Sequence, residues 1–303
     1  MNPELLNDAV SLLCRLIATP STSRDESAVA DIMGGELARC GFQPRREANN
    51  VWAVAPGYVE GRPTLLLNAH LDTVRPVASW TRNPYGAGRE GNRLYGLGAN
   101  DCGGGLVSLL QAFRHLSFQE QPGYNIIYLA SAEEEVSGKD GMERVLRCLP
   151  PVSVAIVGEP TGMQPAIAEK GLMVVDGYAK GVSGHAARRE GLNAIYEALP
   201  DLLTLRDYRF ERVSKLLGET LVQVTQVESG TQHNVVPDSL HFVVDVRTNE
   251  LYTNEEAFAL LDGATRSELR ARSFRLHSSH IDPAHPLVAW LTAHGKQPFG
   301  SPT

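Results

Sequence analysis

The stretch Leu67-Asn68-Ala69-His70-Leu71-Asp72-Thr73-Val74 decides the fold of this chain. It begins as an apolar run, typical of a buried strand, and then places a histidine and an aspartate two positions apart. Because alternate side chains of a strand share one face, the Asp72 carboxylate can orient the His70 imidazole for binding a metal. Such a pair is also common as a simple buried polar contact, so by itself it leaves both interpretations open.

A glycine-rich loop carries the next acidic residue, Asp101. The loop runs from Tyr95 to Gly105, and the apolar run from Leu106 to Phe113 predicts a helix directly after it. Glycines allow the backbone to approach an ion or ligand closely, although an ordinary turn has the same composition. The loop lacks the Lys-Ser or Lys-Thr ending of a phosphate-binding loop, so phosphate binding is not predicted.

Two further strands are predicted to end in carboxylates. A β-branched and aromatic run begins at Ile126 and ends in Glu133, Glu134 and Glu135, and a second apolar run ends at Glu159 before a proline. Three adjacent glutamates also occur on solvated helices, but few such helices follow so apolar a strand. Open α/β sheets build their sites at the carboxyl ends of strands, and one histidine with several oxygen ligands suits zinc, cobalt or manganese.

These four motifs, in this order, resemble the zinc-dependent aminoacylases and carboxypeptidases that include acetylornithine deacetylase and succinyl-diaminopimelate desuccinylase. The resemblance covers nearly the whole chain and implies two metal ions per subunit. His70, Asp101 and Glu159 would bind the first ion, and Asp101 would bridge to a second ion bound by Glu135. Asp72 would orient His70, and the bond between Asp101 and Cys102 would be cis.

Catalysis is also implied by the resemblance. Glu134 corresponds to the family's general base, which takes a proton from water and later protonates the leaving amine. With three glutamates in a row, Glu133 is the alternative for this role. The nearest branch is that of the N-acylornithine deacylases of arginine biosynthesis, whose products would be ornithine and acetate or succinate. A desuccinylase or dipeptidase on the same scaffold, or a catalytically silent fragment, are the alternatives.

A change in pattern after Lys170-Gly171 predicts a second domain. Strands are expected over 172–178, 220–227 and 240–246, with a helix over 193–205 and no further acidic strand ends. The predicted fold is therefore α/β: a metallopeptidase-type catalytic domain, with a mixed sheet flanked by helices, and a smaller inserted α+β domain. We place the catalytic domain at 1–170 and 284–303 and the insert at 171–283.

The insert contains three candidate site residues. His185 lies in a Ser-Gly-His loop whose counterpart in the family reaches into the active site of the other subunit of a homodimer and stabilises an oxyanion. Asn234 and Arg247 correspond to residues that contact the polar groups of the substrate. An arginine can bind a carboxylate in a bidentate manner, but a lone strand arginine is more often a surface residue.

Composition is that of an ordinary enzyme. The chain has 303 residues and a net charge of −7, which argues against nucleic-acid binding. The opening segment up to Pro20 predicts an amphipathic helix rather than a signal peptide, and no run approaches the roughly 20 apolar residues of a membrane span. The four cysteines show no metal-type spacing, so reduced thiols and a cytoplasmic location are expected.

The end of the sequence departs from the family's pattern. The family's last metal ligand is a histidine beyond a Gly-Ser-Pro-Thr stretch, and here the sequence ends with that stretch at Thr303. His277, His280, His285 and His294 do not lie in a matching motif. We therefore expect a chain shortened at its C-terminal end, with an incomplete second metal site.

Overall fold

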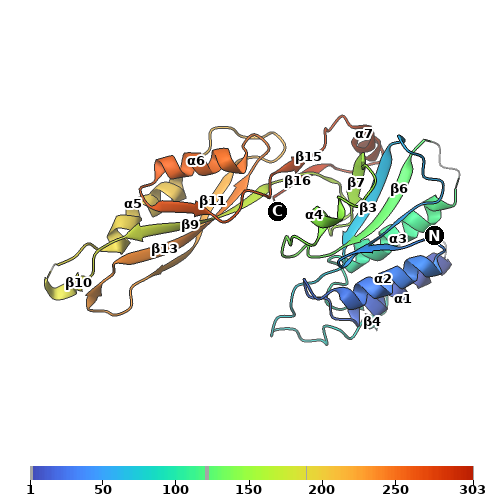
Figure 1. Ribbon diagram of the computed structural model, residues 1–303, viewed down its shortest axis with the longest axis horizontal. Coiled ribbons are helices and arrows are strands. Elements are labelled where there is room, and N and C mark those ends of the chain that lie inside the picture. The colour runs from blue at the N-terminus through green and yellow to red at the C-terminus, as the bar shows by residue number, and fades with distance from the viewer. Residues whose placement is uncertain (1–2, 120–122, 189, 303) are drawn as a thin grey trace. The chain divides into compact units, whose positions relative to one another are not determined.

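The computed structural model describes residues 3–119, 123–188 and 190–302, which form two compact units, Met1–Pro160 and Thr161–Thr303 (Figure 1). The helices of the first unit are α1 (Pro3–Ile17), α2 (Ser27–Arg39), α3 (Gly103–Ser117) and α4 (Met142–Val145). Its strands are β1 (Arg45–Glu47), β2 (Asn50–Val54), β3 (Thr64–His70), β4 (Gly88–Glu90), β5 (Arg93–Tyr95), β6 (Asn125–Ser131) and β7 (Val154–Val157).

A five-stranded mixed sheet with the order β1-β2-β6-β3-β7 forms the centre of this unit. Strand β3 runs parallel to both β6 and β7, whereas β2 pairs antiparallel with β6. In the register of the sheet His70 lies opposite Ser131, and Asn68 lies opposite Val157. The carboxyl ends of the three parallel strands therefore lie at one edge, and the acidic residues that follow β6 and β7 are brought towards His70.

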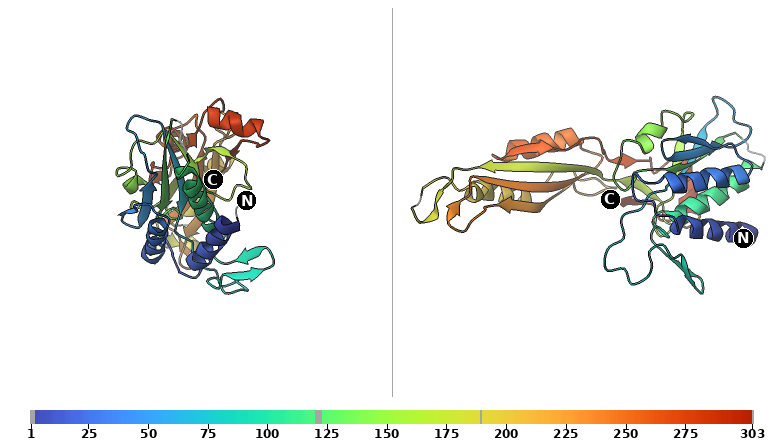
Figure 2. Two further views of the ribbon diagram at one scale, coloured as in Figure 1. Left: turned by 90° about the vertical axis from the view of Figure 1, so that its right-hand side faces the viewer. Right: turned by 60° about the horizontal axis from the view of Figure 1, so that its bottom comes forward.

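Helices cover both faces of this sheet (Figures 1 and 2). On one face α1 and α3 pack together, and α3 also contacts β3 and β6. Leu106, Leu110 and Phe113 recur at helical spacing on α3 and are fully buried against Tyr128 of β6, as the apolar periodicity of this segment predicts. On the other face α4 contributes Val145 to a smaller apolar cluster. The predicted mixed sheet flanked by helices is confirmed.

The second unit contains three sheets and three α-helices within the described residues. Its helices are α5 (Ala194–Asp207), α6 (Asn254–Ala264), α7 (Pro286–Ala293) and the short 3₁₀ helix η1 (Ala186–Arg188). Its strands are β8 (Ala166–Glu169), β9 (Gly171–Lys180), β10 (Gly184–His185), β11 (Leu221–Ser229), β12 (Val235–Val236), β13 (Ser239–Thr248), β14 (Glu268–Ala271), β15 (Ser279–His280) and β16 (Phe299–Ser301).

The largest sheet has the order β11-β13-β9-β14, and all its neighbouring strands are antiparallel. The other two sheets have the orders β15-β8-β16 and β10-β12. Helices α5 and α6 contact each other and both contact β9, so they cover the same face (Figure 1). The core between helices and sheet includes Met173, Val175, Phe242 and Val244, all almost completely buried. These residues alternate along β9 and β13, which is why the period-two pattern of the sequence correctly predicts an α+β arrangement.

Most expected elements appear with shifts of a few residues at their ends. The segments predicted at 172–178, 193–205, 220–227 and 240–246 correspond to β9, α5, β11 and β13. Helix α6 was not predicted, although Thr253 and Glu256 form a complete capping box at its start. The apolar sequence of β7 is typical of a buried strand. In the structure β7 lies at an edge of its sheet, and Val157 is 53% exposed. The limits of an inserted domain at 171–283 remain a prediction.

Two further expectations concern cysteines and membranes. Cys14, Cys40, Cys102 and Cys148 are all free thiols. Among the helices of the described residues, none combines the length and apolar character needed to span a bilayer.

Candidate metal centre and active site

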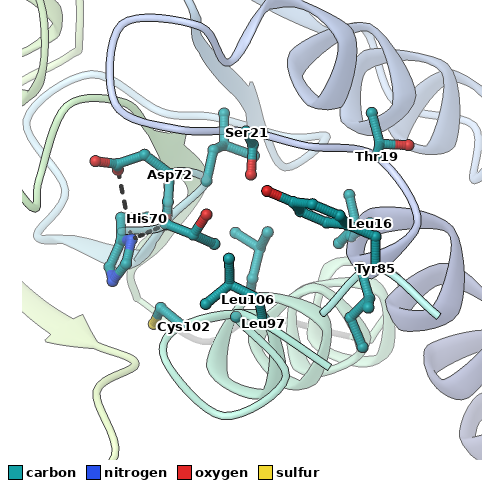
Figure 3. A pocket seen from close by; sticks show the side chains of 14 residues that line it. Leu16, Thr19, Ser21, His70, Asp72, Tyr85, Leu97, Cys102 and Leu106 are labelled. Atoms are coloured by element: carbon teal, nitrogen blue, oxygen red, sulfur yellow. Dashed lines mark hydrogen bonds and ion pairs between the residues drawn. The ribbon is translucent and has the colours of Figure 1, made fainter. Parts of the chain in front are cut away.

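His70 is the last residue of β3, and its side chain is held in one orientation. The ring is buried, and its Nδ1–H donates a hydrogen bond of 2.8 Å to the backbone carbonyl of Asp72. The same nitrogen lies 3.4 Å from Asp72 Oδ1. Figure 3 shows these two residues side by side, with the sulfur of Cys102 below the imidazole. Because Nδ1 is bonded to this carbonyl, Nε2 is the nitrogen that can bind a metal ion once it has lost its proton.

Two carboxylates lie around this nitrogen. Asp101 Oδ1 is 3.0 Å from His70 Nε2, and Glu159 Oε1 is 3.9 Å from it. Together with Cys102, these residues form a group whose ligand atoms all lie within 4.8 Å of one another. The bond between Asp101 and Cys102 is cis, as the sequence resemblance implies. A residue at the end of β3 and residues that follow β5 and β7 are therefore brought close together.

The electrostatics of this point favour a positive charge. Burial lowers the pKa of His70, but the hydrogen bond to Asp72 and the negative charge of Glu159 outweigh it and raise the pKa to about 10. For Glu159, burial raises the pKa to about 7, and the carboxylates of Glu134 and Asp101 act in the same direction. Oxygen lone pairs facing an imidazole lone pair are stable only with a proton or a cation between them. The donor set of one imidazole and two carboxylates fits a divalent metal ion.

Asp72 links this centre to the loop of three glutamates. Its Oδ1 accepts a hydrogen bond of 3.0 Å from the backbone N–H of Glu134, and its Oδ2 accepts bonds from the N–H of Glu135, at 3.1 Å, and the hydroxyl of Ser23, at 2.7 Å. Burial raises the pKa of Asp72, but its hydrogen bonds with His70 and Ser23 lower it more strongly. A buried, charged Asp72 thus orients His70 and also fixes the backbone of the glutamate loop.

The three glutamates point in different directions. Glu134 Oε2 lies 3.9 Å from His70 Nε2, and its side chain is 55% exposed. Glu133 has a positive φ of 56° and is buried, and its carboxylate accepts a hydrogen bond of 3.4 Å from the N–H of Asp140. The carboxylate of Glu133 fills the space beside Gly138, where any Cβ would overlap it. The geometry therefore places Glu134, and not Glu133, next to the centre.

Glu135 lies at the margin of the centre. Burial raises its pKa, and the charge of Asp101 raises it further. Its side chain does not belong to the group of four ligand atoms found in the described residues. For Cys102, burial raises the pKa of the thiol to about 12, and the negative charge of Glu159 adds to this effect. The thiol donates a short hydrogen bond to the carbonyl of Gly158.

The three candidate residues of the second unit lie in two places. His185 on β10 is opposite Val235, and the N–H of Ala186 donates to the carbonyl of Asn234, so the His185 and Asn234 loops are joined. Arg247 lies near the other end of β13 and donates two hydrogen bonds to Asp245, of 2.8 and 3.2 Å. Ser239 begins β13, and at a rise of about 3.3 Å per residue the strand places Arg247 roughly 26 Å further along.

The match to a known family decides the class of this protein. Residues 66–291 match the model of peptidase family M20/M25/M40, which is more than half of the chain and spans the whole metal centre. The chain belongs to this family. Its members are amide-bond hydrolases, so the centre described above is part of a hydrolase.

Curated relatives in the family support the same class. A succinyl-diaminopimelate desuccinylase of Xylella fastidiosa (strain M12) is 26% identical over 280 residues, which is 85% of this chain and 73% of the relative. An acetylornithine deacetylase of Edwardsiella ictaluri (strain 93-146) is 28% identical over 298 residues, covering 91% and 77% of the two chains. The family that the sequence motifs indicated is thereby confirmed.

Solved structures of M20 enzymes share the fold. The aminopeptidase PepT from Bacillus cereus superposes with a TM-score of 0.76 at 19% identity and covers 99% of this chain and 84% of its own. The YXEP protein of Bacillus subtilis, described as a dinuclear metal-binding peptidase, superposes with a TM-score of 0.70 at 16% identity, covering 100% and 83%. At these identities the likeness establishes the α/β architecture.

Ser23 is a site residue that was not predicted from the sequence. It lies in Thr19-Pro20-Ser21-Thr22-Ser23, a polar loop after α1 that carries no motif of a metal site. Its hydroxyl reaches Asp72 across 49 positions of the chain. No local pattern indicates such a contact, because it depends on how α1 and the following loop pack against the strand end.

Proposed function

We propose that this M20 family protein is a metal-dependent deacylase that removes an acetyl or succinyl group from the α-amine of N-acyl-L-ornithine or a close relative. The observation that carries the proposal is the group formed by His70, Asp101 and Glu159 with the Glu134 carboxylate beside it. A divalent metal ion between the three donors would relieve the repulsion among them, and a carboxylate beside that ion is the group that hydrolysis needs.

Each residue has a distinct role in this proposal. His70, Asp101 and Glu159 would hold one ion, and Asp101 would bridge to a second ion held by Glu135. Zinc, cobalt or manganese would polarise the amide carbonyl and acidify water. Glu134 takes a proton from the attacking water and delivers it to the leaving amine nitrogen.

The residues of the second unit would bind the substrate. Asn234 and Arg247 are proposed to contact its polar groups, and the guanidinium of Arg247 offers the geometry for a carboxylate. His185 is proposed to act from the neighbouring subunit of a homodimer and to stabilise the oxyanion. Its exposure on a short strand leaves the ring accessible to a second subunit.

Two relatives with different names support an N-acyl amino acid as the substrate without choosing between the acyl groups. Desuccinylase and deacetylase relatives match at 26% and 28% identity, and both names describe removal of an acyl group from an amino acid. A desuccinylase is therefore the second candidate. A third is a dipeptidase, since the yeast di-peptidase Dug1p shares the fold with a TM-score of 0.65.

The test is a parallel turnover assay on N-acetyl-L-ornithine, N-succinyl-L-ornithine, N-succinyl-diaminopimelate and a set of dipeptides. The protein is loaded in turn with zinc, cobalt or manganese, and release of the free amine is measured. We expect the highest kcat/KM on an N-acylornithine, with no turnover by a Glu134→Gln control. A higher kcat/KM on N-succinyl-diaminopimelate or on dipeptides would show that N-acylornithine is not the substrate. No turnover of any of these amides by the metal-loaded protein would refute the deacylase function.

A further inference from the structure

We propose that Glu26 is a positioning residue of the active site, which holds the loop of three glutamates so that Glu134 faces His70 and Glu133 is turned away. The proposal rests on the proposed function, in which Glu134 is the general base. It adds a residue that lies outside the four sequence motifs. Glu26 is completely buried, immediately precedes α2 and contacts Glu133 across 107 positions of the chain.

Four consecutive backbone N–H groups, those of residues 132–135, are bound by side chains from other parts of the first unit. The first donates to Asn50 Oδ1 at 3.0 Å, the second to Glu26 Oε1 at 3.2 Å, and the last two to the carboxylate of Asp72. All three acceptor residues are almost completely buried. Because β6 ends at Ser131, these side chains bind the backbone where a neighbouring strand no longer does.

Glu26 Oε1 binds two residues whose backbone is in an unfavourable conformation. It also accepts a hydrogen bond of 2.6 Å from the N–H of Arg24, and Arg24 and Glu133 have φ angles of 76° and 56°. Residues other than glycine adopt this left-handed region at a cost and keep it only where their surroundings hold them. The left-handed turn at Glu133 is the one that directs its side chain away from that of Glu134.

The position of Glu26 before α2 does not account for its carboxylate. A polar side chain at this position commonly binds the free N–H groups of its own helix, but the side chain of Glu26 makes no such bond. Its second oxygen, Oε2, accepts a hydrogen bond of 2.8 Å from the amide of Asn49. Burying a carboxyl group costs free energy unless hydrogen bonds offset the cost. Here those bonds go to loops, and one of them is the glutamate loop.

Glu36 provides a matched control on the same helix. It is 3% exposed, and its carboxylate accepts hydrogen bonds from Arg15 and Arg39. Glu36→Ala therefore removes a buried carboxylate from α2 and leaves the bonds of the glutamate loop in place. Any general effect of losing a buried acid from this helix should appear in Glu36→Ala as well.

Two substitutions of Glu26 separate the hydrogen bond from the side chain that provides it. Glu26→Ala removes the acceptor. Glu26→Gln keeps one oxygen that can bind the N–H groups of Arg24 and Glu133, and its NH₂ group faces Asn49, whose amide can turn over to accept it. Glu26→Gln is therefore the conservative variant that should rescue the loop.

The first experiment is amide hydrogen exchange on the full chain, resolved to single residues. In the wild type the N–H groups of residues 132–135 should exchange slowly. In Glu26→Ala the N–H of Glu133 should exchange about tenfold faster or more, because it has lost its acceptor. Glu26→Gln and Glu36→Ala should stay close to the wild type. Rapid exchange of Glu133 in the wild type, or unchanged exchange in Glu26→Ala, would overturn the proposal.

The second experiment measures the kinetics of the zinc-loaded proteins on an N-acylornithine. A misplacement of about 1 Å can cost about 10²-fold in rate, so Glu26→Ala should lose about 10–100-fold in kcat. Its KM and its bound zinc should stay near the wild-type values, because the general base acts on water in the transition state. Glu26→Gln should recover most of the loss. Equal losses of kcat in Glu26→Ala and Glu36→Ala would leave Glu26 with a structural role only and would contradict the proposal.

The two experiments distinguish this proposal from the proposed function. If the wild type hydrolyses no amide, the proposed function fails, and hydrogen exchange still decides whether Glu26 holds the loop. If the wild type is active and Glu26→Ala keeps its kcat, the proposed function stands and the positioning role is refuted. If Glu26→Ala does not fold, Glu26→Asp, whose carboxylate is one methylene shorter, replaces it in both experiments with the same expected results.

Discussion

Replacing Asp72 by asparagine tests how the centre is held together. The carboxylate is 1% exposed and accepts hydrogen bonds on both oxygens, from the N–H of Glu134 on Oδ1 and from the N–H of Glu135 on Oδ2. An asparagine presents one oxygen and one NH₂ group. In either orientation, the amide NH₂ group faces a backbone N–H. Two donors then point at each other, and this contact provides no acceptor for either of them.

The expected cost of Asp72→Asn follows from this count. One buried donor without a partner costs about 1–3 kcal/mol. The remaining hydrogen bonds lose the assistance of a charge, which roughly halves their strength. We expect a destabilisation of about 3 kcal/mol in the metal-free protein. Substituting a residue that orients a metal-binding histidine typically weakens metal binding by about 10–100-fold, so we expect a similar loss of metal affinity in Asp72→Asn.

A matched control is available in Ser23→Ala. It removes the 2.7 Å hydroxyl donor from Asp72 and leaves the charge and both backbone contacts in place. We expect it to cost about 1 kcal/mol and to change metal affinity by less than Asp72→Asn does. Urea unfolding of the metal-free proteins gives the stabilities, and competition with a chromophoric chelator gives the metal affinities.

Two results would contradict this reasoning. If Asp72→Asn binds metal as tightly as the wild type and unfolds at the same urea concentration, the network does not hold His70 in place. If Ser23→Ala is as costly as Asp72→Asn, the hydroxyl and not the carboxylate is the important partner.

Three further predictions concern single residues. Glu134→Gln should keep its metal content but lose about 10²–10⁴-fold in kcat. Glu133→Gln, in which the substituted side chain is turned away from the centre, should lose much less. An unchanged kcat in Glu134→Gln would exclude Glu134 as the general base. Asp176→Asn should destabilise the protein by about 1 kcal/mol at neutral pH, because hydrogen bonds from Arg272 lower the pKa of Asp176 from 3.8 to about 2. That stabilisation is complete above pH 3.8 and is lost as the pH falls through about 2. The free energies of unfolding of wild type and Asp176→Asn should therefore converge near pH 2. A difference that stays constant with pH would contradict the ion pair. Arg247→Lys should raise KM for an N-acylornithine by about 10-fold with little change in kcat, since a bidentate contact becomes a single one, and an unaltered KM would exclude Arg247 from substrate binding.

The sequence by itself was sufficient to predict the apolar strands that lead to the site, the main strands of the second unit and the order of the acidic residues. The parallel strands β3, β6 and β7 are apolar runs whose ends turn polar, so His70, Glu135 and Glu159 are marked locally, and Asp101 is marked by its glycine-rich loop. The same is true of the alternating pattern of β9 and β13. These features depend on neighbours only a few positions away, and a linear reading therefore finds them.

The tertiary structure alone decided how the side chains are directed. Three consecutive glutamates are equivalent in the sequence, but the positive φ of Glu133 and the space beside Gly138 turn its carboxylate away and leave Glu134 next to His70. The contacts of Ser23 with Asp72 and of Glu26 with the backbone of Glu133 likewise join residues that lie far apart in the chain. Such contacts depend on the packing of helices and loops against the sheet edge, for which no periodicity of the sequence exists.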